Sequence, residues 1–532
     1  MPIDPGLRRL ALSTLLAAFP GRTAPEWASR MLAEGLAGHT LFGGNVADPA
    51  QTARLTARLR DARPDALIAI DEEGGDVTRL AHRTGSPYPG NAALGAVDDV
   101  ELTRSVYAAI GADLGAVGIN LDLAPTVDVN TADDNPIIGT RSFGADTLLV
   151  ARHSAAAVAG LQGSAVAACA KHFPGHGATV TDSHLELPTV DAPVAVLRER
   201  DLPPFAASVA AGVQAVMTAH IRVPELTGDD PATFSRIALT DLLRGEYGFR
   251  GVIVTDALEM AGAAVAAGGI GPAAVRALAA GADLLCIGAR VDETLVEAVC
   301  AEIVAALSDG RLAASRLEDA ADRCAALAAW TSRPGVARPG HQPPGSGGAP
   351  AAASRDPGVT AEPDVAAEPD VAAEPDVAAE LGVSAELGVS AELGVVAARR
   401  AVRIEGAAAA DRPLVVQLES PRSIAEGRVP WGLGPHLDGT EQVRVVAADT
   451  SAEALVHRAG ARPIVVVGRH LHRTPADRAL VERLTAEHPV IVVEMGWPSA
   501  WRPVGARGFV TTYGASLANG RAAAEALGLA AD

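Results

Sequence analysis

The sequence predicts an α/β protein with an N-terminal (β/α)8 barrel and a smaller C-terminal α/β sandwich domain. Three observations predict this fold. Between Gly38 and Gly288, short apolar or β-branched runs alternate with amphipathic, alanine-rich segments. Polar side chains stand at the ends of several of these runs, and a second alternating region follows a stretch rich in proline and glycine. Strands that alternate with helices form parallel sheets, and seven or eight such units suit a closed, TIM-like barrel better than an open sheet.

The barrel is expected to occupy residues 1–330. Its strands are predicted at Thr40–Phe42, Ala66–Ile70, Gly118–Leu123, Ala165–Ala170, Val213–Thr218, Gly251–Val254 and Asp283–Ile287. Helical patterns lie between or after them, among them Asp99–Leu114, Leu148–Leu161, Pro272–Ala280 and Glu293–Leu307. Pro272 suits the first position of a helix, where its missing N–H costs no hydrogen bond.

The first residues permit two interpretations. Arg8 and Arg9 precede an apolar run that ends at Phe19, a pattern shared by export signals and by amphipathic helices. We favour the first helix of the fold, because no convincing small-x-small cleavage site follows and another helical pattern begins at Trp27. No apolar run reaches the roughly 18 residues that a membrane-spanning helix needs.

Composition excludes some classes of partner. The net charge of −20 argues against a general affinity for nucleic acid or for anionic membranes. The four cysteines, Cys169, Cys286, Cys300 and Cys324, lack the Cys-x-x-Cys spacing and fall in apolar or helical stretches. We interpret them as reduced thiols of the core, which fits a cytoplasmic protein.

Residues 331–396 are predicted to be a linker. They begin with a stretch rich in proline, glycine and alanine, and continue with three AEPDVA hexads and three AELGV(S/V) hexads. A period of six matches neither a helix nor a heptad, so the first half is expected to be extended or disordered and the second half weakly helical.

The C-terminal domain is expected at residues 397–532, entered by a helix at Val396–Arg403. Its strands are predicted at Leu414–Leu418, Val443–Ala447, Pro463–Val467, Val490–Val493 and Gly508–Thr511, with helices such as Pro475–His488 and Ala515–Leu529.

The segment from Lys171 to His184, KHFPGHGATVTDSH, carries the most chemistry. It follows an apolar strand and combines a cation, three imidazoles and a carboxylate with two glycines and a proline. Asp182 and His184 stand two apart, so one can orient the other if the loop curls, and a carboxylate-backed imidazole is an acid/base suited to neutral pH. The alternatives are a glycine-rich loop with incidental histidines, or a metal site. The spacing of the histidines offers no compact ligand pair, so no metal and no cofactor are expected.

Asp256 follows the apolar run Gly251–Val254 and should point into the barrel mouth, where a carboxylate can attack an anomeric carbon. Its alternative role is to cap the next helix. Asp71, Asp128, Lys171-His172 and His220 also follow strand ends, which form the catalytic face of such barrels.

Two further loops offer short carboxylates and guanidinium groups that suit sugar hydroxyls, namely Asp71–Arg79 and Asn135–Gly144. Taken singly, either is equally an ordinary salt-bridged loop.

Together these motifs resemble glycoside hydrolase family 3, and within it the bacterial β-N-acetylglucosaminidases (β-N-acetylhexosaminidases) in their two-domain form. The patterns DxEGGxVxR, NPxIGxRSFG, KHFPGHGxxxxDSH and (S/T)DxLxM occur here in the family's order. Met495–Pro498 and Thr512–Ser516 also resemble the family's second domain. Asp76 is a departure, because the family more often has arginine there. Its negative charge would lie near the mouth and alter recognition of the leaving group or of anionic substrates.

The resemblance implies a role for individual residues. Asp256 aligns with the nucleophile of a retaining mechanism, and His184, paired with Asp182, aligns with the acid/base. Four residues align with those that hold the non-reducing sugar: Asp71, Arg141, Lys171 and His172. His220 matches a family motif near the site, and we expect it to have a structural role rather than a catalytic one.

The leading hypothesis is a retaining exo-β-N-acetylglucosaminidase that acts on small glycosides such as peptidoglycan-recycling fragments. The alternatives are a retaining β-N-acetylglucosaminide or β-glucoside phosphorylase, because a histidine repels phosphate less than a carboxylate does, and a β-glucosidase. A non-catalytic sugar sensor is disfavoured because both catalytic residues are present. The expected partner is a small carbohydrate; the sequence leaves the oligomeric state open.

Overall fold

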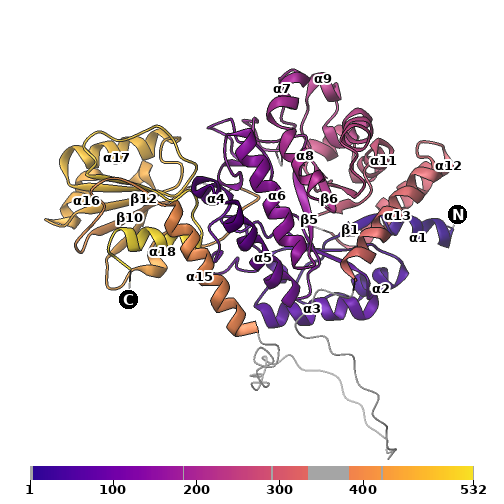
Figure 1. Cartoon of the computed structure of the whole chain (residues 1–532), viewed down its shortest axis with the longest axis horizontal. Coiled ribbons are helices and arrows are strands. Elements are labelled where there is room, and N and C mark those ends of the chain that lie inside the picture. The colour runs from indigo at the N-terminus through magenta and orange to yellow at the C-terminus, as the bar shows by residue number, and fades with distance from the viewer. Residues whose placement is uncertain (1–3, 184, 289–290, 334–382, 421–422, 531–532) are drawn as a thin grey trace, which may run out of the picture.

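The computed structural model describes residues 4–183, 185–288, 291–333, 383–420 and 423–530. Two bodies are visible in Figure 1, a barrel formed by the first part of the chain and a smaller sheet domain formed by the last part. The predicted fold class is confirmed.

The barrel is built from eight parallel strands in the order β7-β6-β5-β4-β3-β2-β1-β8. Their bounds are β1 Leu15–Ala17, β2 Gly38–Leu41, β3 Leu67–Ile70, β4 Leu121–Asp122, β5 Ala167–Phe173, β6 Ala215–Thr218, β7 Val252–Thr255 and β8 Leu285–Ile287. An isolated parallel bridge between Val254 of β7 and Leu284, the residue before β8, links the two ends of this order and closes the ring.

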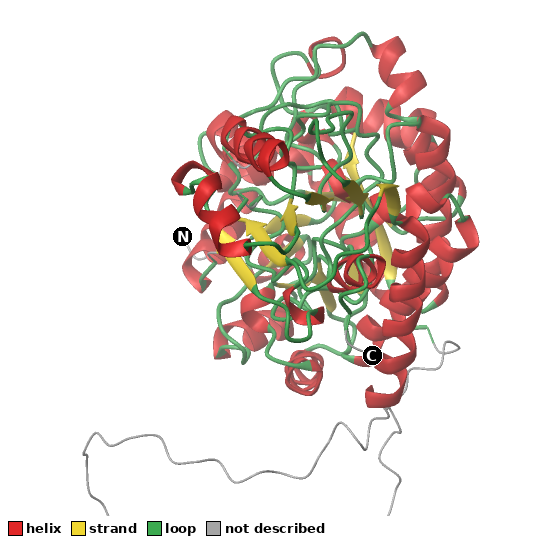
Figure 2. Cartoon of the chain, turned by 90° about the vertical axis from the view of Figure 1, so that its left-hand side faces the viewer, coloured by secondary structure: helices red, strands yellow, loops and turns green. Residues whose placement is uncertain are grey.

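Helices surround the strands (Figure 2). They are α1 Pro5–Leu12, α2 Glu26–Glu34, α3 Pro49–Ala62, α4 Asn91–Val97, α5 Val100–Ala116, α6 Thr147–Gly163, α7 Val194–Arg200, α8 Pro203–Ala210, α9 Pro224–Thr227, α10 Ala261–Ala267, α11 Ile270–Ala280, α12 Glu293–Ser308 and α13 Ala314–Thr331, with a π-helix at Ile237–Glu246 and short 3₁₀ turns that include η2 Gly139–Arg141. Aspartates begin three of the long helices by accepting a backbone N–H, namely Asp99, Asp146 and Asp292.

The inside of the barrel is filled by small and medium side chains such as Leu67, Leu121, Cys169 and Val254, and Leu327 of α13 packs against this cluster. All four cysteines are buried and free.

The C-terminal domain contains a six-stranded sheet in the order β11-β10-β12-β13-β14-β9, parallel except for β9. Its elements are β9 Arg403–Gly406, β10 Leu414–Leu418, β11 Gln442–Val445, β12 Ile464–Gly468, β13 Val490–Glu494, β14 Gly508–Thr511, α16 Ala452–Ala459, α17 Pro475–Glu487 and α18 Leu517–Ala526. Leu414 and Val416 pack with α16 and α17, whereas the alternate residue Val415 packs with α18. Helices on both faces make the predicted sandwich.

Helix α15, Val383–Ala401, joins the two domains and packs against α4, α5 and α18. In Figure 1 it runs in orange along the side of the barrel. The predicted boundary between residues 396 and 397 falls inside this helix. Most of the predicted linker, residues 334–382, lies outside the described residues.

Two local predictions differ from the structure. The segment up to Phe19 is expected to be helical, but α1 ends at Leu12 and β1 then enters the barrel between β2 and β8. Residue Arg403 begins β9 rather than ending a helix. Strands β1 and β9 have only three and four residues, so pairing with strands distant in the sequence, and not local propensity, determines that they form.

No single helix in the described ranges is long and apolar enough to cross a membrane; only the pair α10 and α11, bent by 93°, meets that criterion of length and composition together.

Candidate active site

A network of charged side chains lies at the carboxyl ends of the barrel strands, around Lys171. Lys171 belongs to β5, which extends through His172 to Phe173, so both candidate side chains stand on a strand and not on the loop that follows. Nζ of Lys171 lies 2.8 Å from Oδ1 of Asp71 and 2.8 Å from Oε1 of Glu73. The two sequence motifs that begin at Asp71 and at Lys171 therefore meet at one place.

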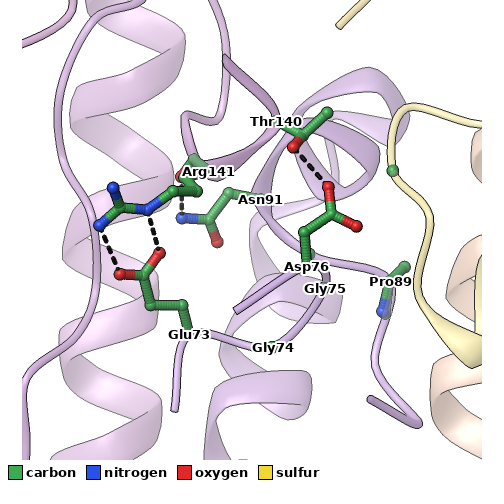
Figure 3. Close-up of a pocket in the computed structure, with 10 residues that line it drawn as sticks. Glu73, Gly74, Gly75, Asp76, Pro89, Asn91, Thr140 and Arg141 are labelled. Carbon is green, nitrogen blue, oxygen red and sulfur yellow. Dashed lines mark hydrogen bonds and ion pairs between the residues drawn. The ribbon is translucent and has the colours of Figure 1, made fainter. Parts of the chain in front are cut away.

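Glu73 anchors this network. Its two carboxylate oxygens accept hydrogen bonds from Nε and Nη2 of Arg141, at 2.9 and 2.7 Å, in a two-pronged pair (Figure 3). Burial opposes ionisation of Glu73, but the Arg141 and Lys171 cations outweigh it and hold the pKa of this carboxyl well below its usual range. The pKa values of Lys171 and Arg141 are raised by Asp71 and Glu73 against the effect of burial. All three groups therefore stay ionised at neutral pH.

Asp128 holds the histidine of this network. Its carboxylate lies 2.8 Å from Nδ1 of His172 and also accepts the backbone N–H groups of His172 and His176. Nε2 of His172 faces Nη2 of Arg141 at 3.4 Å. Because a guanidinium can only donate, this geometry assigns the proton to Nδ1 and leaves Nε2 as an acceptor toward the site.

His176 stabilises the loop that follows β5 through hydrogen bonds of its ring. Its ring lies 2.7 Å from the hydroxyl of Thr179 and 3.1 Å from that of Ser183. Burial and the neighbouring His172 lower the pKa of His176 to about 4, so the ring is neutral at pH 7. Asp182 is half-buried on this loop, and His184 lies outside the described residues. The pairing of Asp182 with His184 stays a prediction.

Asp256 directly follows β7 and is half-buried. Its backbone N–H donates to Thr218 and its Oδ1 accepts from the backbone of Ala257 at 2.8 Å. The helix-capping alternative is excluded, because α10 begins only at Ala261 and Met260 occupies its cap. Burial raises the pKa of the Cys286 thiol inside the barrel, and the nearby carboxylates of Asp256 and Asp71 raise it further. Asp71 and Asp256 directly follow the parallel strands β3 and β7, so both lie at the carboxyl end of the barrel.

His220 supports the turn after Asp256. Its ring is fully buried, with Nδ1 2.8 Å from the Thr233 hydroxyl and Nε2 3.1 Å from the carbonyl of Ala257. This contact with a carbonyl oxygen makes it a donor that holds the backbone beside Asp256.

Two residues of the site were not among those that sequence reasoning selected. The sequence assigned Glu73 no role, although an acid two residues after Asp71 and directly before two glycines signals a buried turn. Asp128 was noted only as a strand-end residue. In the described ranges, no group of three or more histidine, cysteine, aspartate or glutamate side chains has the arrangement of a metal site.

The family model described as "Glycosyl hydrolase family 3 N terminal domain" matches residues 11–327, which include every residue of the site above. The chain belongs to glycosyl hydrolase family 3. It is a glycoside hydrolase, as the motifs predicted.

Curated relatives support the same assignment. A β-hexosaminidase from Stenotrophomonas maltophilia (strain K279a) is 39% identical over 273 residues, covering 49% of this chain and 79% of the relative. The β-hexosaminidase A of Pseudoalteromonas piscicida is 36% identical over 329 residues, covering 57% of this chain but only 55% of that relative's length.

Among solved structures, a family 3 β-N-acetylglucosaminidase from Paenibacillus sp. str. FPU-7 superposes with a TM-score of 0.80 and 30% identity, covering 99% of this chain and 97% of the other. The likeness therefore includes the C-terminal domain. The predicted resemblance to this branch of the family is confirmed.

Proposed function

We propose that the chain is a retaining exo-β-N-acetylglucosaminidase that releases terminal N-acetylglucosamine from small glycosides. The observation that carries the proposal is the convergence of Lys171, Asp71 and Arg141 at the end of the barrel that also holds Asp256. Cations and carboxylates fixed by one another present hydrogen-bonding groups of both kinds to sugar hydroxyls. The likeness to β-hexosaminidases and to a β-N-acetylglucosaminidase supports the choice of sugar.

In the first step, a carboxylate oxygen of Asp256 attacks the anomeric carbon while the bond to the leaving oxygen breaks. The imidazolium of His184, oriented by Asp182, gives its proton to that oxygen. In the second step, His184 takes a proton from water, the water oxygen attacks the anomeric carbon, and Asp256 is released. A histidine suits this role because it carries no negative charge to repel the nucleophile.

The sugar is held by the charged network. Lys171 and Arg141 donate to hydroxyl oxygens and Asp71 accepts, while Nε2 of His172 accepts from Arg141 and so orients its guanidinium beside the sugar. The substrates we propose are peptidoglycan-recycling fragments, with the protein acting in the cytoplasm.

The test is turnover of an aryl N-acetylglucosaminide by the wild type, Asp256→Asn and His184→Ala. Asp256→Asn should lose activity by about three orders of magnitude or more, because an amide cannot form the covalent intermediate. His184→Ala should slow substrates with poor leaving groups far more than activated ones. Equal losses on both substrates would contradict the role of His184. Formation of the sugar 1-phosphate as the main product in phosphate buffer would replace hydrolysis by phosphorolysis.

A further inference from the structure

The turn from Glu73 to Val77 carries two carboxylates, those of Glu73 and Asp76, that bind adjacent residues of the η2 turn. Glu73 binds Arg141, and Oδ2 of Asp76 accepts a 2.6 Å hydrogen bond from the hydroxyl of Thr140 (Figure 3). Gly74 and Gly75 make this divergence possible, since both have positive φ angles, 72° and 60°. Adjacent residues of the η2 turn are therefore held by two acids of a single tight turn.

The other partners of Asp76 belong to the C-terminal domain. Its Oδ1 accepts the backbone N–H of Ala515 at 2.8 Å, and Nη2 of Arg469 lies 3.4 Å from its Oδ2. The Asp76 and Arg469 side chains expose only 3% and 6% of their surface. Nη2 of Arg469 also pairs with Glu426 at 2.7 Å, so this buried cation faces two carboxylates. A buried charged group with partners on both sides costs much to disturb.

The surrounding backbone leaves little space for adjustment. A Cβ on Gly75 would lie 2.7 Å from Cα of Gly90, and one on Gly514 would lie 3.0 Å from the carbonyl oxygen of Pro89. Asn91, which follows these residues, donates from Nδ2 to the carbonyl of Arg141 at 2.7 Å. The C-terminal domain therefore packs closely, at Gly514, against the barrel loop that also contacts Arg141 through Asn91.

We propose that Asp76 is a positioning residue that uses the docked C-terminal domain to fix Arg141 in the sugar site. Asp76 replaces the arginine common in the family. Its carboxylate accepts hydrogen bonds from Thr140, Arg469 and the backbone of Ala515. Its function is to connect the domain interface to the η2 turn, in place of the role in leaving-group recognition expected from the sequence. The inference rests on the proposed function, because it gives Arg141 a sugar to bind.

The test uses three variants of the full chain: Asp76→Ala removes the shared carboxylate, and Thr140→Val and Arg469→Met each remove one of its partners. Each should raise KM for the aryl N-acetylglucosaminide by about tenfold with little change in kcat, because a displaced Arg141 weakens binding of the ground state and the transition state alike. Arg469→Met is decisive, since Arg469 lies in the other domain. Thr140→Ser retains the hydroxyl and should restore a near wild-type KM.

Arg400→Ala is the matched control. Arg400 forms an exposed ion pair with Asp99 between the same two domains, at 2.9 Å. Its loss should leave KM unchanged, because Asp99 does not touch the η2 turn. If Thr140→Val and Arg469→Met gave the KM of Arg400→Ala, the positioning role would be overturned.

A second measurement is independent of activity. Amide hydrogen exchange of the segment 137–143 should be faster in Arg469→Met and Asp76→Ala than in Arg400→Ala and the wild type. Unchanged exchange would overturn the inference even if the wild type proved inactive on N-acetylglucosaminides. Absence of wild-type turnover on these substrates, by contrast, refutes only the proposed function.

Discussion

Lys171 and Glu73 form a buried ion pair in the centre of the site, with Nζ and Oε1 2.8 Å apart and each side chain only 2% exposed. Glu73 therefore pairs with two cations, because it also binds Arg141, and Asp71 supplies the second negative charge at Lys171. Asp71 is left at the exposed side of Lys171, where 20% of its side chain is accessible. The arrangement keeps Lys171 and Arg141 charged and fixed in position.

Replacing Glu73 by Gln should therefore damage both folding and binding. Removing one partner of a buried ion pair leaves an uncompensated charge and should cost about 3–5 kcal/mol of unfolding free energy. Chemical denaturation measures the loss, and KM should rise in the protein that remains folded. Glu101→Gln, in an exposed pair with Arg104, is the control and should change the unfolding free energy by less than about 1 kcal/mol. Similar unfolding free energies for the two variants would contradict the anchoring role of Glu73.

Asp128→Asn should impair the site without disturbing its shape. The amide oxygen can still accept the backbone N–H groups of His172 and His176, but its NH2 would face Nδ1 of His172. The proton would move to Nε2, which could then no longer accept a hydrogen bond from the Arg141 guanidinium.

Loss of one such hydrogen bond should lower kcat/KM by about tenfold or more. The far-ultraviolet circular dichroism spectrum should match that of the wild type. Wild-type kcat/KM in a folded Asp128→Asn variant would show that the tautomer of His172 is unimportant.

His176 should make stability depend on pH. Its folded pKa of about 4 lies below the ordinary histidine value of about 6.5, so between these values the unfolded chain binds a proton that the folded protein does not. The stabilisation is complete above pH 6.5 and is lost as the pH falls to 4. This group contributes on the order of 3 kcal/mol.

Denaturant unfolding of the wild type and His176→Asn between pH 7.5 and 4 measures this contribution. The difference in unfolding free energy between the wild type and His176→Asn should become smaller as the pH falls. The exposed His457→Asn variant should follow the wild-type profile. A His176→Asn difference that is constant with pH would contradict the neutral, buried state of His176.

Gly177→Ala should disrupt the loop that carries Asp182. A Cβ at Gly177 would lie 1.9 Å from the carbonyl oxygen of Val129, so the backbone must shift. We expect a loss of about 2–3 kcal/mol in unfolding free energy and a large drop in activity. Gly163→Ala is the matched control, because no neighbouring atom lies within 4 Å of its Cβ at the end of α6. It should be neutral or stabilising by up to about 1 kcal/mol, and an equal loss in both variants would contradict the close packing at Gly177.

Much of the fold could be read from local pattern. The apolar runs that predicted strands at Leu414–Leu418 and Gly508–Thr511 coincide with β10 and β14. The long helices α5, α6 and α12 lie within a few residues of their predicted bounds, because aspartate caps and helical periodicity are recorded in neighbouring residues. Strand β1 was missed, since three apolar residues after a helix fit either structure and only pairing with β2 and β8 decides between them.

The sequence by itself determined the two-domain α/β architecture and the polar residues at the strand ends, because alternation and strand termini depend on residues close together in the chain. Only the tertiary structure decided which of these residues touch. It joined Glu73 to Lys171 and Arg141, and it brought Asp76 against Arg469, 393 positions away. Contacts at such separations arise from how the strands and domains pack, and no local spacing encodes them.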